Sequence, residues 1–179
     1  MIISAFTCTG PYAILILLGI KRVENRSQMP VPAKGRCAVS CSKSFCREEF
    51  GDFVQWASRF LTPEDFALLP AWRDVADWPG RIVGTCDYAA RGRNDLTLSG
   101  ETPARAGTLL DWDEGYDTWW DLSGIVRLAN PIPCRGNVGM WQMPADLAVR
   151  VTEADRLSRS MGSTGPATAS DAKSTILTF

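Results

Sequence analysis

The chain has 179 residues, of which 45% are hydrophobic and seven are tryptophan. This length favours one domain with a substantial core, and this composition excludes a chain that is disordered throughout. The formal net charge of −1 excludes a role in polyanion binding that rests on overall charge alone.

The first part of the chain predicts short strands around one helix. Met1–Phe6 has the composition of a strand, and Pro11 is placed to open a helix that continues through Leu18. Gly19 can end that helix in the left-handed conformation. The segment 21–26 then predicts extended or irregular backbone, and Cys37–Cys41 alternates as a strand does.

The middle of the chain changes from helical to extended patterns. Ser44–Leu69 carries apolar residues at helical spacing and predicts one or two helices. Arg81–Tyr88 predicts a strand, and the polar, glycine-containing segment 89–107 predicts a long loop or a loose hairpin. Tyr116–Leu128 and Val138–Gln142 predict two further strands.

A closing helix is expected over Pro144–Leu157, where apolar residues recur on one face. Residues 158–179 begin with a run rich in Ser, Thr, Gly and Ala, so we predict one domain over 1–157 followed by a disordered tail. Short strands mixed with helices indicate an α+β fold rather than a regular βαβ array.

Charge is distributed unevenly along the chain. The segment Ile20–Arg47 holds seven cations and a single acid, Glu24, and the cations are Lys21, Arg22, Arg26, Lys34, Arg36, Lys43 and Arg47. The charged residues of segment 107–121 are five acids and no cation, namely Asp111, Asp113, Glu114, Asp117 and Asp121. Such asymmetry predicts a positive face that attracts an anionic ligand, or else solvated charges on two loops.

The six cysteines do not predict a metal site. They lie at positions 8, 37, 41, 46, 86 and 134, no two form a CxxC pair, and the chain contains no histidine. We therefore expect reduced, mostly buried thiols, no metal or cofactor, and a cytoplasmic protein without a secretory signal. The apolar run Tyr12–Leu18 is too short to cross a bilayer.

Several motifs, taken in order, resemble the ASCH family. The Gly-x-Lys-x-x-Glu-x-Arg pattern of that family matches Gly19 to Arg26, and its closing Pro-Ile-Pro-x-x-Gly-x-x-Gly-x-Trp pattern matches Pro131 to Trp141. Further matches are Pro11-Tyr12-Ala13, Gly35, Gly80 to Gly84, and Trp120 with Leu122. The chain departs from the family at Gly10, where many relatives carry glutamine, and in the segment 91–105.

The resemblance implies a PUA-like small β-barrel with flanking helices and a cleft that binds RNA or a modified nucleotide. Some small relatives hydrolyse an acetylated cytidine with a lysine at the position of Lys21 and a threonine at the position of Glu24. Because Glu24 replaces the threonine here, that mechanism does not transfer intact. The resemblance thus leaves open a binding module, a small amidohydrolase or ribonuclease of the same fold, and a protein-interaction module if the basic residues prove scattered.

Lys21 and Glu24 are the tentative catalytic pair. A carboxylate can hold an ammonium group in place or act as a base on water. The two side chains converge only if a turn or bulge interrupts the segment, since a strict strand would send them to opposite faces. An ordinary salt bridge is the alternative.

The candidate ligand-binding residues are cations and tryptophans. Arg26 can meet a phosphate or a base edge with paired hydrogen bonds. Arg22, Lys34 and Lys43 could extend this contact, or be ordinary surface cations, and Arg135 could present an anion site on a loop or mark a tight turn. Among the tryptophans, Trp112 and Trp119 are predicted to stack on bases, whereas Trp120 and Trp141 are predicted to pack in the core.

Overall fold

The computed structural model describes residues 1–26, 30–92 and 118–162. The strands in these ranges are β1 (Ser4–Cys8), β2 (Val23–Arg26), β3 (Lys34–Cys41), β4 (Arg81–Gly92), β5 (Thr118–Pro133) and β6 (Met140–Gln142). The helices are α1 (Gly10–Leu17), α2 (Arg47–Phe60), α3 (Pro63–Ala67), the 3-10 turn η1 (Trp72–Asp74) and α5 (Ala145–Ser160).

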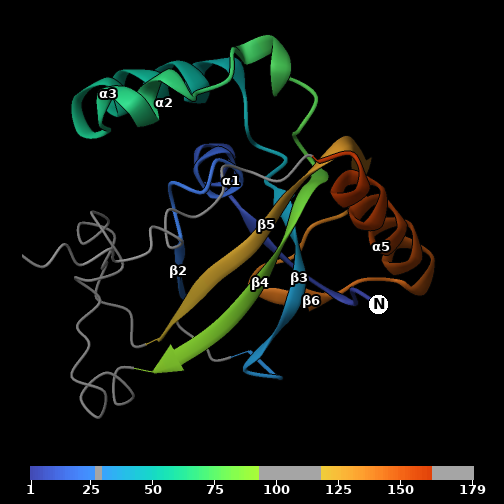
Figure 1. Ribbon diagram of the computed structural model, residues 1–179. Helices are drawn as coiled ribbons and strands as arrows, with labels where there is room; N and C mark the ends of the chain where they lie inside the picture. The colour runs from blue at the N-terminus through green and yellow to red at the C-terminus, as the bar shows by residue number, and fades with distance from the viewer. Residues whose placement is uncertain (27–29, 93–117, 163–179) are drawn as a thin grey trace, which may run out of the picture.

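The strands form one mixed sheet in the order β2-β5-β4-β3-β1-β6. Strand β1 is parallel to β3, and the other neighbours are antiparallel. The β4–β5 register shifts between Ile82 and Gly84 and again between Thr85 and Asp87. Such bulges bend strands, and the sheet curls accordingly (Figure 1). The predicted α+β class is confirmed, and the curled sheet with its flanking helices fits a PUA-like barrel.

Helix α1 packs inside the curl of the sheet. Its residues Ala13 to Leu17 are all buried, as expected for a helix that is apolar on every side. A Cβ added to Gly84 would lie 2.2 Å from Leu17 Cδ2 and 2.7 Å from Val126 O, so only glycine allows α1 to approach β4 so closely. After the helix, Gly19 has a φ of 71°, which confirms the predicted left-handed position.

Helices α2 and α3 lie beyond α1 at one end of the sheet (Figure 1). Helix α2 buries Phe50, Phe53 and Ala57, and its first turn carries acids while its last turn carries Arg59, which suits the helix dipole. Thr62 begins α3 by accepting a hydrogen bond from the Asp65 amide at 3.1 Å. Two helices thus lie within Ser44–Leu69, where one or two were predicted.

Helix α5 covers the other side of the sheet and forms a second apolar cluster with it (Figure 1). A polar network fixes the helix: Arg36 Nη2 lies 2.7 Å from Asp155 Oδ1, and Thr85 donates a hydrogen bond to the same oxygen at 2.6 Å. The helix continues to Ser160 instead of ending at Leu157. Ser158 is buried and accepts a hydrogen bond from the Ala129 amide at 3.3 Å, so the packed part of the chain includes it.

The Asp155 network predicts a specific acid sensitivity. Burial raises the pKa of Asp155, but hydrogen bonds and charge from Arg36 and Thr85 outweigh it and hold the pKa below 3.8. The ionised Asp155 therefore contributes its full stabilisation of the fold above pH 3.8, the pKa of the group in the unfolded chain. That stabilisation is lost as pH falls through the lower pKa of the folded state. Urea unfolding of wild type and Asp155→Asn should differ most near neutral pH, and the difference should shrink on acidification.

The matched control for that experiment is Glu153→Gln, an exposed acid on the same helix. It should leave the free energy of unfolding within about 0.5 kcal/mol of wild type at every pH. A gap between wild type and Asp155→Asn that stays constant with pH would contradict the assignment.

Of the two alternatives for residues 89–107, the loop is wrong in its first residues, whereas the hairpin agrees with them. Strand β4 runs to Gly92, because Ala89 and Ala90 pair with Asp121 and Trp120 of β5. Residues 93–107 lie outside the described ranges. The strand predicted at 1–6 lies at Ser4–Cys8, and the strand predicted at 116–128 continues to Pro133.

All six cysteines are free thiols: four are buried, Cys134 is half-buried and Cys46 is exposed. Among the helices of the described ranges, none combines the length and the apolar character that crossing a bilayer requires.

Candidate functional site

Three charged side chains contact one another between the end of α1 and the edge strand β2, namely Lys21, Glu24 and Arg26. Glu24 Oε2 accepts a hydrogen bond from Lys21 Nζ at 2.9 Å, and Glu24 Oε1 lies 2.8 Å from Arg26 Nη2. The Lys21 amide bonds to Leu15 O at 3.0 Å, which places Lys21 in the turn before β2. This turn brings Lys21 and Glu24 together, as their spacing required.

The Lys21–Glu24 pair is almost completely buried, with exposed fractions of 2% and 5%. Lys21 also donates to Val23 O and lies 5.1 Å from the centre of the Tyr12 ring. A buried ion pair persists only when its hydrogen bonds are satisfied, and here one carboxylate serves two cations. Neither Lys21 nor Glu24 lines the two pockets described below. The pair is therefore not part of the pocket lining, and it positions Arg26 through the contact with Glu24.

Arg26, the second cation that contacts Glu24, reaches toward the surface. Its Nη2 atom donates to Thr7 O at 2.8 Å, and its guanidinium lies 5.6 Å from the ring centres of both Phe6 and Trp120. The side chain is 20% exposed and lines two adjoining pockets. Arg26 is thus held in one orientation while part of its side chain borders both pockets.

The larger pocket has a volume of about 1150 Å³. Three cations line it, namely Arg26 from β2, Lys43 from the segment after β3, and Arg135 from the loop before β6. The described residues around this pocket include no carboxylate; the others are Thr7, Cys41, Ser42, Pro79, Gly80, Pro133, Cys134, Gly136, Asn137 and Val138. Its lining is therefore suited to an anion larger than a single phosphate.

The loop that carries Arg135 is anchored on the sheet. Cys134 Sγ lies 3.4 Å from Ser40 Oγ, and the Cys134 amide donates to Gly80 O at 3.0 Å. A Cβ added to Gly136 would lie 2.8 Å from Thr7 Oγ1, so this glycine permits the close approach of loop and strand. The wall of the larger pocket is therefore a fixed part of the fold.

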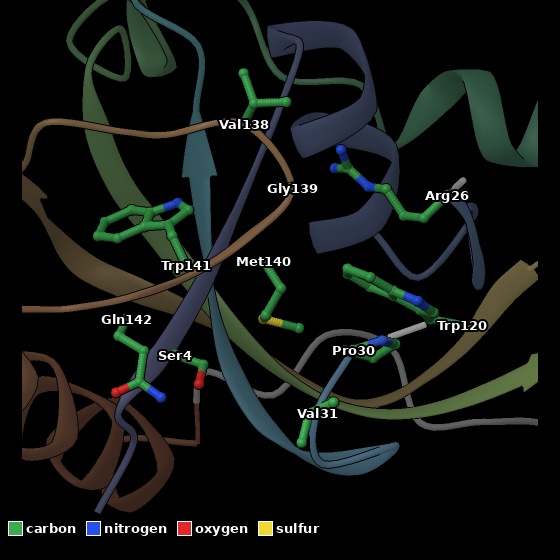
Figure 2. A pocket seen from close by; sticks show the side chains of 10 residues that line it. All are labelled: Ser4, Arg26, Pro30, Val31, Trp120, Val138, Gly139, Met140, Trp141 and Gln142. Atoms are coloured by element: carbon green, nitrogen blue, oxygen red, sulfur yellow. The ribbon is translucent and has the colours of Figure 1, made fainter. Parts of the chain in front are cut away.

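The smaller pocket has a volume of about 340 Å³ and is more aromatic. Trp120, Met140 and Trp141 contribute to its lining, and Figure 2 shows the Met140 side chain between the two indoles. The remaining lining residues are Ser4, Arg26, Pro30, Val31, Val138, Gly139 and Gln142. The described lining has Arg26 as its single charged residue, so this pocket is suited to a flat, weakly polar group.

The thiols at the larger pocket are not activated nucleophiles. Burial raises the pKa of Cys134, which a hydrogen bond with Ser40 only partly offsets, and burial with nearby charge raises the pKa of Cys41 to about 12. Both thiols stay protonated at neutral pH, and a thiol reacts as its thiolate.

The structure brings some of the predicted site residues together and separates others. Arg26 and Arg135 share the larger pocket. Arg22 is exposed and donates to Gly19 O at 3.0 Å, and Lys34 is exposed at the start of β3; neither lines either pocket. Trp119 is buried on the face of β5 opposite Trp120. Trp112 lies outside the described residues.

The basic segment 20–47 does not form one continuous face. Lys21 is buried in its ion pair and Arg36 belongs to the α5 network, while Arg26 and Lys43 face the larger pocket. Trp120 and Trp141 are buried as predicted, yet both also border the smaller pocket. The sequence did not predict two exposed valines that line the smaller pocket, Val31 and Val138, because isolated valines in loops give no functional signal.

No family model matches the chain, and no curated protein sequence matches it. Among solved structures, it is similar to the crystal structure of ASCH from Zymomonas mobilis, with 13% identity, 84% of this chain and 93% of that chain covered, and a TM-score of 0.44. A serine-to-alanine mutant of the same protein matches with 14% identity, 84% and 94% coverage, and a TM-score of 0.44. Both structures carry the name of the family that the motifs of this chain resemble.

Proposed function

We propose that the protein binds RNA or a modified nucleotide in the cleft formed by the two adjoining pockets. The observation that carries this proposal is the set of three cations around the larger pocket, with no carboxylate among its described lining residues. A nucleotide combines an anionic phosphate with a flat base, and the smaller pocket, bordered by two tryptophans, adjoins the cationic one. The free thiols support a cytoplasmic location as part of the proposal.

Arg26 is suited to a ligand rich in acceptor atoms. Its side chain is 20% exposed and lines both pockets. Phosphate oxygens and base carbonyls are acceptors that an arginine fork pairs with well.

Binding should depend on Arg26 and on salt. Short single-stranded RNA should bind with an affinity that falls steeply between roughly 50 and 200 mM salt, because neutralised phosphates release counterions. Arg26→Ala should weaken binding and reduce the slope of log K against log salt by about 0.7 for each phosphate that the arginine neutralises in wild type. Fluorescence anisotropy of labelled RNA over a salt series measures both quantities.

The matched control is Arg73→Ala, an exposed arginine that lines neither pocket. It should leave both affinity and slope unchanged. Circular dichroism must show that Arg26→Ala is folded, since Glu24 loses a partner in this variant. Equal effects of the two substitutions would contradict the proposed site.

The alternative is hydrolysis by the Lys21–Glu24 pair, whose side chains are in contact at 2.9 Å but line neither pocket. Incubating the protein with acetylated cytidine, followed by chromatography, tests it directly. Product that forms with wild type and disappears in a folded Lys21→Met variant would assign catalysis to the pair. Product that survives this substitution would place the active site elsewhere.

A further inference from the structure

We propose that the ligand is a single nucleic-acid strand, held with one unpaired base in the smaller pocket and its neighbouring phosphates in the larger pocket. This inference rests on the proposed function and adds the part of the ligand that each pocket takes. It also assigns Lys43 to the phosphates and adds Val138 as a ligand contact.

The two pockets adjoin each other. Arg26 and Val138 line both, so a ligand can pass from one pocket to the other between these two side chains. Figure 2 shows Arg26 and Val138 at the same end of the smaller pocket, with Gly139 nearby. A base and its own phosphate groups are separated by one sugar, which suits two compartments with a shared border.

The larger pocket has the features of a backbone site. Lys43 and Arg135 are exposed cations that come from segments far apart in the chain, and both face the same space as Arg26. The hydroxyl-bearing residues Thr7 and Ser42 also border it. Cations with added hydroxyl donors are typical of contacts to phosphate and sugar.

The smaller pocket has the features of a base site. Its volume of about 340 Å³ lies at the lower end of the range for small-molecule sites, so it admits one base. Two valines at its lining, Val31 and Val138, are 90% and 98% exposed, although single exposed valines are otherwise unremarkable. Both valines line the pocket, so a base that fills it would cover apolar surface that is otherwise exposed.

A base inside a duplex cannot enter such a pocket while it stays paired and stacked. The ligand is therefore a single strand or an extruded nucleotide. A free nucleoside fills only the smaller pocket, and a phosphate alone fills only the larger one. Joining the two makes the second contact intramolecular, which commonly raises affinity by about 10²–10⁴-fold.

The experiment compares ligands that differ in one part each. The probes are a nucleoside, its 5′-monophosphate, single-stranded RNA and DNA pentamers of each base, a fully abasic pentamer, and a hairpin duplex, all titrated by calorimetry or anisotropy. At least one intact pentamer should bind roughly 100-fold more tightly than its nucleoside. The abasic pentamer and the duplex should both bind at least roughly tenfold more weakly than that pentamer.

The variants separate the two pockets. Lys43→Gln and Arg135→Gln should each reduce the salt slope for the pentamer by about 0.7 and leave nucleoside binding unchanged. The double variant Val31→Ser/Val138→Ser should weaken nucleoside and pentamer by the same factor, roughly threefold to tenfold, with the salt slope unchanged. Arg73→Gln is the control cation and should change neither.

The outcomes distinguish this inference from the proposed function. Nucleoside binding without any gain for the pentamers would overturn the two-pocket strand and leave nucleotide binding intact. Failure of every probe to bind would overturn both. Equal affinity for the abasic and intact pentamers, or for duplex and single strand, would remove the base from the smaller pocket.

Discussion

Replacing Lys21 by methionine is expected to lower the free energy of unfolding by about 3–5 kcal/mol. Lys21 and Glu24 are both buried, and the substitution removes one of the two cations that the carboxylate contacts. Glu24 then keeps Arg26 as its single cationic partner in a buried site, and removing one partner of a buried ion pair costs free energy. Urea unfolding followed by tryptophan fluorescence measures the loss.

A double variant shows whether the pair acts as a unit. Glu24→Gln alone leaves two cations without their carboxylate, whereas Lys21→Met/Glu24→Gln removes one charge of each sign. The double variant should therefore lose less stability than the sum of the single variants, by about 0.5–3 kcal/mol. Arg73→Met, an exposed cation, should change stability by no more than about 1 kcal/mol. Strict additivity would contradict an energetic interaction between Lys21 and Glu24. A loss of stability for Lys21→Met as small as that for Arg73→Met would contradict a cost for leaving Glu24 with one cation.

Replacing Trp120 by alanine is expected to cost about 3–5 kcal/mol. The indole is 1% exposed and packs edge-on to Phe6, with ring centres 5.7 Å apart, and against Tyr88 at 5.9 Å. It also forms part of the smaller pocket and lies beside the Arg26 guanidinium. The variant should therefore lose both stability, measured by circular dichroism in urea, and affinity for single-stranded RNA.

Trp120→Phe is the matched comparison. Phenylalanine keeps an aromatic ring and removes the indole N–H, which has no acceptor among the described residues. Removing an unsatisfied buried donor offsets part of the lost packing, so this variant should cost clearly less than Trp120→Ala. A cost for phenylalanine as large as that for alanine would mean that the N–H is satisfied in solution, by water or by another part of the chain.

Local patterns in the sequence predicted the parts of this fold that depend on neighbouring residues. Helix α1 was expected from Pro11, its apolar run and Gly19, because helix initiation and a left-handed end are set within a few residues. Contact between Lys21 and Glu24 followed from their spacing once a turn was assumed. Strand β4 extended beyond its predicted end, since pairing with β5 supports residues 89–92 whatever their own preference.

The sequence by itself determined the α+β class and helix α1 with its left-handed end. It left the contact of Lys21 with Glu24 dependent on a turn, and it offered Arg26 and Arg135 as ligand candidates on the same footing as Arg22 and Lys34. The tertiary structure decided which cations meet: Arg26, Lys43 and Arg135 share a pocket, while Arg36 holds α5 and Arg22 and Lys34 line neither pocket. The tertiary structure also decided that Val31 and Val138 line the smaller pocket together. Helical and strand periodicities fix only which face of an element a residue occupies. Which faces of distant segments meet depends on sheet register and bulges, and these are set by long-range pairing and by the close approach that Gly84 and Gly136 permit.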